Sequence, residues 1–257
     1  MIPSWRARLV WQRNAEVYLR TWFLNLLPPL LEPLLYIAAF GVGMGALVRT
    51  IPVGGLDVPY RLYVAPGMIA VAIMQQAYFE GTFGSFIRMY YQKTFDAIVA
   101  TPCSLEDVVA GEIAWAATKA VGAAALMLAA LWPFGLVSMP SSLWILPLAA
   151  LAGWFFASGG FCIAALVPQI DAFNLPMFLL IMPMFALSET FFPLPASGWM
   201  RTLGSLLPLT QVSRMARAAA LGLSLPASSL PALAALAAGS ILFSWLGLRL
   251  MRRRLIP

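Results

Sequence analysis

The sequence predicts an all-α integral membrane protein with six transmembrane helices. Of its 257 residues, 61% are apolar and only 10% are charged, whereas soluble domains are about 45 to 50% apolar and about 25% charged. A helix needs roughly 20 apolar residues to cross a bilayer, so a chain of this length accommodates six or seven spans and little else. The composition excludes a soluble domain of any size.

Residues 1–21 form the first predicted element, a helix that lies along the membrane surface. Three uncharged side chains, Trp5, Leu9 and Gln12, lie on one side of this helix. Three arginines, Arg6, Arg13 and Arg20, lie on the other side. Such a pattern is typical of an amphipathic helix at the inner leaflet. An ordinary charged N-terminus is the alternative interpretation.

Six apolar segments follow, separated by polar residues, prolines and glycines. The loop at 49–61 contains turn-forming residues, and the segment Ser138-Met-Pro-Ser-Ser breaks a charge-free stretch that is too long for one helix. Gly41, Gly43 and Gly45 offer a small surface for close helix contact. The predicted spans are 22–47, 62–87, 108–137, 143–167, 173–189 and 227–248.

The region 191–222, between the fifth and sixth spans, is apolar but interrupted by prolines and glycines. We predict a pair of short re-entrant or interfacial helices on the outer face. Its three arginines, Arg201, Arg214 and Arg217, either anchor the region at headgroup level or contact anionic groups. Alternatively, these arginine side chains only snorkel to lipid phosphates.

The basic residues predict the orientation in the membrane. The chain has 16 basic and 10 acidic residues, and arginines cluster before the first span and after the last. By the positive-inside rule both termini are cytoplasmic, which requires an even number of spans. The polar loop at 88–107 is then cytoplasmic as well. No basic patch is interleaved with base-stacking aromatic residues, so we expect no binding to nucleic acid.

Several classes of chemistry are absent from the sequence. There is no histidine, which removes the usual general base near neutral pH and the commonest metal ligand. There is no GxxxxGK[ST] motif for ATP phosphates, and Cys103 and Cys162 are not in a CxxC motif. We expect neither catalysis nor a metal or cofactor on this chain, and any ATP-driven process needs a separate ATPase.

The cytoplasmic segment 93–107 has the signals of two capped helices. Thr94 can cap a first helix with Asp96 in its first turn, and Pro102 ends this helix. Ser104 can cap a second helix with Glu106 and Asp107 in its first turn. This pattern predicts a stiff projection, with a solvated loop as the alternative.

Glu32, Glu80 and Lys119 are the ionisable residues well inside the predicted spans. Such residues are costly in lipid unless paired or hydrated. All three fall roughly 12 to 18 Å from the inner boundary, at about 1.5 Å per residue, so they can meet. Either Lys119 bridges the two glutamates and clamps three helices, or the three line a hydrated vestibule for a polar headgroup. Three uncharged residues on the first two spans are further candidates for a substrate path: Tyr36, Gln76 and Tyr78.

Three segments carry a resemblance to a known family. They are Glu32-Pro-Leu-Leu-Tyr36 running into Gly41-Val-Gly43-Met-Gly45, the segment Gly111-Glu-Ile-Ala-Trp115-Ala-Ala-Thr-Lys119-Ala, and Phe191-Phe-Pro193 with Pro208 and a later arginine. In order and spacing the sequence resembles the NodJ-type permeases over nearly its whole length. These are the membrane subunits of ATP-binding-cassette exporters for nodulation lipo-oligosaccharides and related envelope glycolipids and polysaccharides.

The resemblance implies a permease in the bacterial inner membrane that forms a homodimer on two copies of an ATPase subunit, which carries ATP and Mg. It implies a coupling helix at 93–107, to which Lys93 and Phe95 also belong, and export of an amphiphilic substrate. Similar permeases often have Ser-Gly where this chain has Ser188-Glu189. We expect Glu189 to pair with an arginine of the outer region and to form an outer gate with Phe191, Phe192 and Pro193.

Three other functions remain open. Within the exporter class, the substrate is alternatively a drug or a simple lipid. An ATP-independent transporter would have inverted repeats, and no internal repeat is evident. A lipid-modifying membrane enzyme would need a nucleophile and base, for which only Glu32 and Glu80 are available.

Overall fold

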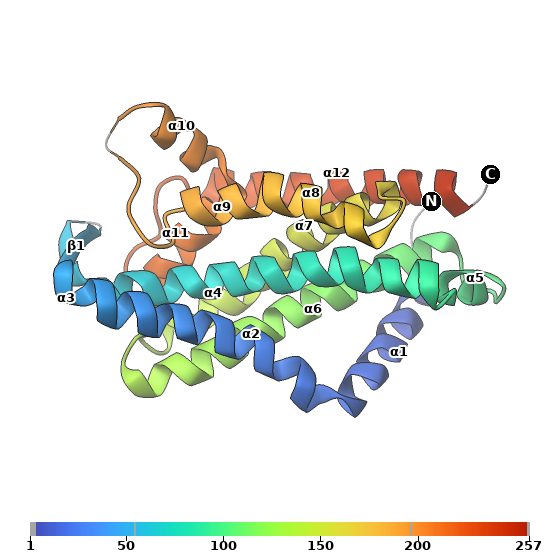
Figure 1. Cartoon of the computed structure of the whole chain (residues 1–257), viewed down its shortest axis with the longest axis horizontal. Helices are drawn as coiled ribbons and strands as arrows, with labels where there is room; N and C mark the ends of the chain where they lie inside the picture. The colour runs from blue at the N-terminus through green and yellow to red at the C-terminus, as the bar shows by residue number, and fades with distance from the viewer. Residues whose placement is uncertain (1–3, 54, 196, 256–257) are drawn as a thin grey trace.

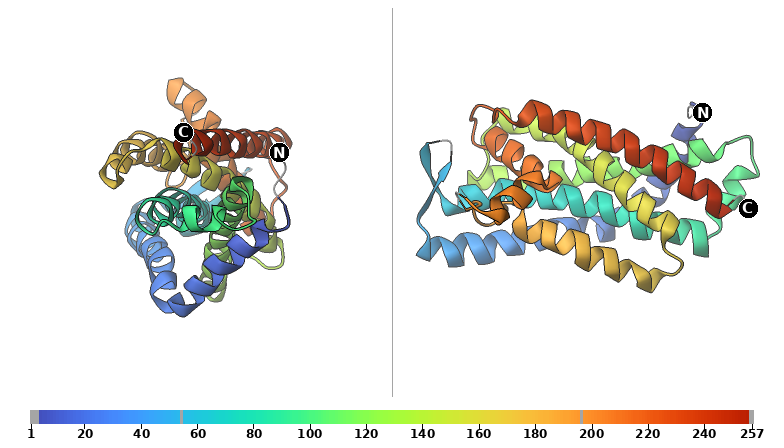
Figure 2. Two further views of the ribbon diagram at one scale, coloured as in Figure 1. Left: turned by 90° about the vertical axis from the view of Figure 1, so that its right-hand side faces the viewer. Right: turned by 90° about the horizontal axis from the view of Figure 1, so that it is seen from above.

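The computed structural model describes residues 4–53, 55–195 and 197–255, and this part of the chain is a bundle of long helices (Figure 1). Five helices are long and apolar enough to cross a membrane: Tyr60–Tyr91, Leu105–Phe134, Ser141–Leu166, Ile170–Leu187 and Ser229–Leu255. Their length and hydropathy define a helical protein with several membrane spans. The end-on view in Figure 2 shows them packed side by side.

The predicted first span is one run of α2 (Trp22–Tyr36), the π-helical η1 (Ile37–Met44) and α3 (Gly45–Leu47). Among the described residues of this run, Leu34–Leu47 is an apolar helix that is shorter than the five long ones. The side chains of seven residues here lie outside the described part, namely Leu24, Leu26, Pro28, Pro29, Glu32, Pro33 and Val42. The predicted role of Glu32 therefore remains a prediction.

Within the predicted loop at 49–61, the structure has two paired strands. Strand β1 (Thr50–Val53) pairs antiparallel with β2 (Leu56–Pro59), in a register that places Ile51 opposite Val58. These two side chains are buried, so a short alternating apolar pattern decides the structure. Gly55 provides the left-handed turn residue with φ 84°.

If the run from Trp22 to Leu47 is counted as the first, the second long helix consists of α4 (Tyr60–Phe79) and two π-helical segments, η2 (Glu80–Gly84) and η3 (Ile87–Tyr91). It continues four residues beyond the predicted boundary at 87, so Arg88 belongs to this helix. The expectation that the polar loop begins at Arg88 was wrong. Arg88 remains helical because its charge is matched by carboxylates inside the bundle.

Two further long helices complete the centre of the bundle. One is α6 (Leu105–Leu131) with the 3₁₀ turn η4 (Trp132–Phe134), and the other is η5 (Ser141–Trp144) with α7 (Ile145–Leu166). The fifth comprises η6 (Ile170–Phe173), α8 (Asn174–Pro176), η7 (Met177–Ile181) and α9 (Met182–Leu187). The last, α12 (Ser229–Leu255), continues beyond the predicted end at 248 and carries the basic tail as helix.

Small residues allow the central helices to approach closely. A Cβ on Gly81 would lie 2.4 Å from the backbone oxygen of Ala157, and a Cβ on Gly153 would lie 2.8 Å from the Cβ of Ala120. The predicted glycine surface is only partly in contact. A Cβ on Gly41 would lie 3.7 Å from Arg61 Cβ, whereas a Cβ on Gly43 or Gly45 would meet nothing within 4 Å in the described single chain.

The bundle has two distinct ends (Figure 1). At the α5 end lie α1 (Ala7–Arg20), α5 (Thr94–Val99) and both chain termini. At the hairpin end lie β1, β2 and the short helices α10 (Trp199–Leu206) and α11 (Pro208–Ala220). These two helices occupy the predicted outer region. Helix α4 is almost wholly enclosed by its neighbours, whereas α8, α9 and α12 present large apolar side chains outward.

Candidate functional site

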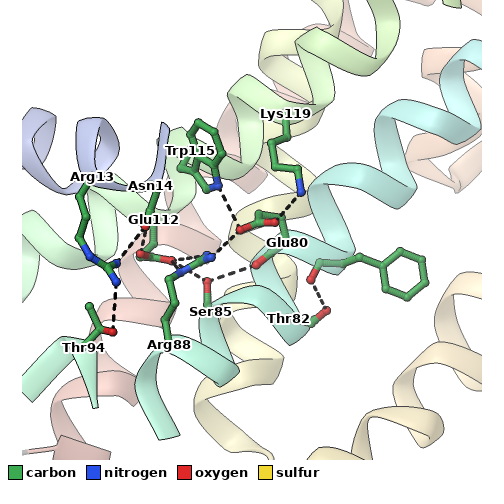
Figure 3. A network of polar contacts seen from close by, with 11 residues as sticks. Arg13, Asn14, Glu80, Thr82, Ser85, Arg88, Thr94, Glu112, Trp115 and Lys119 are labelled. Carbon is green, nitrogen blue, oxygen red and sulfur yellow. Dashed lines mark hydrogen bonds and ion pairs between the residues drawn. The ribbon is translucent and has the colours of Figure 1, made fainter. Parts of the chain in front are cut away.

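A network of buried charges links the second and third long helices near the α5 end (Figure 3). At its centre, one Glu80 carboxylate oxygen lies 2.8 Å from Lys119 Nζ, and the other lies 2.7 Å from Arg88 Nη1. The indole Nε1 of Trp115 donates to the same carboxylate at 3.1 Å. The predicted ion pair between Lys119 and Glu80 is present, and its second cation is Arg88.

Glu112 is the second anion of this network, and its side chain is fully enclosed. Its carboxylate accepts from Arg88 Nε at 2.8 Å, from Ser85 Oγ at 3.2 Å and from Asn14 Nδ2 at 2.8 Å. Two anions therefore face two cations, and each carboxylate has at least three donors. A buried charge is tolerated only when it is paired and hydrogen-bonded in this way.

Two local features of the sequence place these side chains together. Glu112, Trp115 and Lys119 follow the spacing i, i+3, i+7, so they lie on one face of α6. On the opposite helix, the π-helical segments between Glu80 and Tyr91 change the helical register. Gly84 is needed there, because a Cβ on it would lie 2.8 Å from Glu80 Oε1.

Glu112 was not among the predicted site residues, and Arg88 was predicted to lie in a loop. Both residues belong to the buried network together with the predicted Glu80 and Lys119. Counting the two-turn spacing from Lys119 back to Glu112 would have found the missing anion. The π-helical segments change the helical register and thereby bring Arg88 between the two glutamates. No comparable signal in the sequence predicts this change.

Helix α1 docks against α6 through the same network. Val10 and Asn14 are its buried residues, and Gly111 lies beneath them, where a Cβ would be 2.6 Å from Val10 Cβ. Trp11 Nε1 donates to Thr118 Oγ1 at 2.9 Å. Trp5 and Leu9 are exposed and face away from the bundle.

Arg13 does not lie on a solvated face as its place in the amphipathic pattern suggested. Its guanidinium donates to Asn14 Oδ1 at 3.1 Å and lies 3.4 Å from Thr94 Oγ1 (Figure 3). Partial burial lowers the pKa of this guanidinium, which the negative charge of Glu112 partly offsets. Arg13 thus connects α1 to the start of α5.

The predicted coupling segment contains α5 followed by a turn and the capped start of α6. Phe95 is fully buried, with its ring centroid 6.4 Å from that of Phe161 on α7, whereas Asp96 is exposed. Lys93 precedes the helix in a left-handed conformation with φ 53°. The expectation that Thr94 caps this helix was wrong, because Thr94 is its first helical residue and its hydroxyl faces Arg13.

The second predicted cap is confirmed. Ser104 and Asp107 form a reciprocal capping box, in which Asp107 N donates to Ser104 Oγ and Ser104 N donates to Asp107 Oδ2. Asp107 also accepts from the backbone and hydroxyl of Ser4. Glu106 pairs with Arg252, and the backbone oxygen of Pro102 accepts from Arg6. The start of α6 therefore connects α1, α5 and α12.

A second polar cluster lies at the hairpin end and consists of Tyr63, Glu189, Arg214 and Arg217. Arg214 binds the Glu189 carboxylate through two donors, at 2.7 and 2.8 Å, and this carboxylate raises the pKa of Arg214. The predicted pairing of Glu189 with an outer arginine is thus present. Arg201 is elsewhere, on the exposed helix α10.

Arg217 occupies the buried centre of this cluster. It donates to the backbone oxygens of Glu189 at 2.7 Å and Tyr63 at 3.2 Å, and its guanidinium lies 3.8 Å from the centroid of the Tyr63 ring. Burial lowers its pKa. Glu189 itself has φ 57°, a left-handed conformation that favours glycine.

The remaining predicted residues lie in separate places. Tyr36 and Phe191 belong to an aromatic cluster with Phe40 and Phe185. Phe192 is exposed near the ring of Tyr60. The Tyr78 hydroxyl is buried without a hydrogen-bond partner in the described part of the chain. Gln76 is half-buried on α4, and Pro193 lies between α9 and α10.

These features define a class: a multi-pass helical membrane protein with a buried charge network and a short helix at one end of the bundle. The chain belongs to the ABC-2 type transporter family, which it matches over residues 6–221. Membership makes it a component of a transporter rather than a catalytic enzyme, and implies a partner that binds ATP.

Individual relatives in this family are nodulation proteins. The chain is 35% identical to Nodulation protein J of Sinorhizobium fredii over 219 residues, which cover 84% of this chain and 82% of that protein. It is 37% identical to Nodulation protein J of Rhizobium leguminosarum bv. trifolii, covering 83% and 80%. It is 33% identical to Nodulation protein J of Rhizobium meliloti, covering 99% and 95%.

Proposed function

We propose that this chain is the membrane subunit of an ATP-driven exporter that moves an amphiphile, a lipo-oligosaccharide or lipid-linked glycan, across the bacterial inner membrane. The observation that carries the proposal is the position of α5. It lies at one end of the bundle between two long helices that share a buried charge network, with Phe95 held inside and Asp96 exposed. The similarity to Nodulation protein J supports the choice of an amphiphilic substrate.

The proposed topology has six spans, with the run from Trp22 to Leu47 as the first. The α5 end is cytoplasmic, because α1 and the C-terminal arginines of α12 gather positive charge there. The hairpin end with α10 and α11 then faces outward. Two copies of the chain form a dimer, and each binds one copy of a separate ATPase subunit that carries ATP and Mg.

The proposed mechanism is a two-state switch driven from the cytoplasmic side. Closure of the ATPase dimer on ATP displaces α5, and Phe95 transmits this displacement to α7 through Phe161. The charge network clamps the second and third long helices, so they move as one body. At the outer end, movement of α11 relative to α4 separates Arg217 from Tyr63 and opens the path.

The charge network supports the clamp interpretation of Glu80 and Lys119 over the vestibule. Arg88 is shared between both glutamates, and Trp115 and Asn14 occupy further acceptor positions. In a hydrated vestibule, water and substrate would donate hydrogen bonds to the carboxylate oxygens of Glu80 and Glu112 instead. In the proposed mechanism the network transmits movement, and substrate passes elsewhere along the protein.

The test is transport into inverted membrane vesicles that contain this chain and its co-expressed ATPase. We expect ATP-dependent accumulation of a lipo-oligosaccharide, absent when the ATPase carries an inactivating substitution. Accumulation of a dye or simple phospholipid in its place assigns the substrate to the drug or simple-lipid class. Accumulation that is independent of ATP contradicts the exporter proposal.

A further inference from the structure

A pocket of about 200 Å³ lies between α1 and the second long helix, at the edge of the charge network. Arg13 and Asn14 of α1 line one side, and Arg88 and Gln92 line the other. Pockets that enclose a whole small molecule have volumes of roughly 300 to 1,000 Å³. This pocket therefore accommodates a single polar group rather than an entire lipid or glycan, and the proposed function does not use it.

The charge network beside this pocket has an excess of positive charge. Its described members include three cations and two anions, namely Arg13, Arg88 and Lys119 with Glu80 and Glu112 (Figure 3). The two glutamates form ion pairs with Arg88 and Lys119. No carboxylate in the described part of the chain forms an ion pair with Arg13. Arg13 is therefore the cation without a matching anion.

The Arg13 guanidinium has donors left for an anion. It carries five N–H groups, and its hydrogen bonds in the described part of the chain go to two neutral oxygens, at 3.1 Å on Asn14 and 3.4 Å on Thr94. The second of these contacts is long for a hydrogen bond. A partly buried cation with only neutral acceptors is stabilised by an anion beside it. Phosphate suits this role, because guanidinium N–H groups bind phosphate oxygens in pairs.

The lining of the pocket favours an anion, and its rim places that anion at the membrane surface. No residue that lines the pocket is acidic. Val17 of α1 and Ile87 of η3 belong to the lining as well, and both are exposed apolar side chains. Apolar side chains of an interfacial helix lie at the boundary between headgroups and acyl chains. Basic pockets between helices on the cytoplasmic side bind the headgroups of anionic lipids.

We infer that this pocket binds the phosphate group of an anionic lipid in the cytoplasmic leaflet. The phosphate accepts hydrogen bonds from Arg13 and supplies the negative charge that the network lacks, while the acyl chains extend past Val17 and Ile87. Because Arg13 also contacts the first residue of α5, the bound lipid stabilises the end of the bundle that the proposed mechanism moves. The inference rests on the membrane orientation in the proposed function but not on the proposed substrate.

Gln92→Glu tests the inference without altering the charge network. It places a carboxylate of the chain itself in the pocket, where the carboxylate repels the phosphate and pairs with Arg13. Gln169→Glu is the matched control, because Gln169 is an exposed glutamine that follows α7 at the same end of the bundle and does not line the pocket. Both variants add the same charge, so general repulsion of anionic lipids is equal.

The experiment is native mass spectrometry of the full chain released from nanodiscs with equal amounts of phosphatidylglycerol and phosphatidylcholine. We expect one retained phosphatidylglycerol per copy in the unaltered chain and in Gln169→Glu. Retention should be about tenfold weaker in Gln92→Glu and in Arg13→Gln, as for the loss of one charge-assisted hydrogen bond. Arg13→Lys keeps the charge and should keep the preference for phosphatidylglycerol. Thermal midpoints establish that the variants fold.

Equal retention of phosphatidylglycerol by Gln92→Glu and Gln169→Glu overturns the inference, and so does equal retention of the two lipids by the unaltered chain. Nanodiscs of phosphatidylcholine alone with added inorganic phosphate separate the lipid from a free ion. A retained phosphate ion there, without retention of phosphatidylglycerol in the mixed nanodiscs, overturns the lipid assignment. The measurement uses neither ATPase nor export substrate, so its failure is distinguishable from failure of the proposed function.

Discussion

At the scale of single residues, the charge network depends most on Glu112. This carboxylate binds Arg88 and Ser85 of the helix Tyr60–Tyr91 and Asn14 of α1. Its partner Arg88 retains only Glu80 if Glu112 is neutralised. An uncompensated buried charge is more costly than the pair was favourable, so the network should be sensitive to the loss of one member.

We expect Glu112→Gln to lower the free energy of unfolding by about 3 kcal/mol, the lower end of the usual cost of breaking a buried ion pair. The measurement is unfolding in mixed detergent micelles. Glu16→Gln is the control, because Glu16 is an exposed acid on α1, and it should change stability by less than about 0.5 kcal/mol. Equal effects of the two substitutions would contradict the assignment of Glu112.

The left-handed conformation of Glu189 leads to a second residue-scale prediction. Glu189→Ala and Glu189→Gly both remove the bidentate contact with Arg214, but only alanine retains the strain at φ 57°. The glycine variant should therefore be more stable than the alanine variant, by about 1 kcal/mol. Thermal midpoints of the two variants measure this difference, and an alanine variant of equal or greater stability would refute it.

The sequence could predict the Glu80 and Lys119 pair because each is a rare charge at a similar depth in an apolar segment. It could not predict Arg88 as their partner, because the π-helical register of Glu80–Gly84 and Ile87–Tyr91 decides where that side chain points. Glu112 was missed for a different reason: it lies only four residues beyond the predicted start of the third span at 108, so it was not counted among the charges well inside the spans.

At the scale of elements, the docking of α1 depends on close contact with α6 at Gly111. A methyl group there would lie 2.7 Å from the backbone oxygen of Ala7. We expect Gly111→Ala to displace α1 and to accelerate cleavage by trypsin after Arg13 and Arg20. Gly122→Ala, on the same helix but with open space around it, should leave cleavage unchanged. Unchanged cleavage in Gly111→Ala would show that this contact does not hold α1.

The exposed face of α5 is the proposed contact for the ATPase. Asp96→Lys reverses a charge on this face while Phe95 stays buried. We expect the affinity for the ATPase to fall about tenfold, equivalent to roughly 1.4 kcal/mol. Asp57→Lys is the matched control, because Asp57 is an exposed acid at the hairpin end. Equal co-purification of the ATPase with both variants would place the contact elsewhere.

The sequence predicted the end of a helix well where a local motif determines that end. The capping box at Ser104 and Asp107 fixes the start of α6, three residues before the predicted span. The ends of the second and last long helices were placed too early, because Arg88 and the C-terminal arginines remain helical when tertiary partners receive them. The hairpin was missed because proline and glycine obscured the alternation of Ile51, Val53 and Val58.

At the scale of the whole molecule, the single chain leaves much apolar surface without a protein partner. Large side chains of α8, η7, α9 and α12 are exposed, among them Leu175, Phe178, Leu179 and Ile241. Lipid covers such surface in a membrane protein, and a second copy of the chain would cover part of it in the proposed dimer. Composition alone predicted a membrane protein, but it contains no information on which surface meets a second copy.

The most direct test of the proposed function starts from co-expression of this chain with its ATPase and purification in lipid nanodiscs. The mass of the resulting particle and its rate of ATP hydrolysis are then measured together. We expect a particle with two copies of each subunit that hydrolyses ATP. A stable particle that contains this chain without any ATPase would contradict it and would favour an ATP-independent transporter.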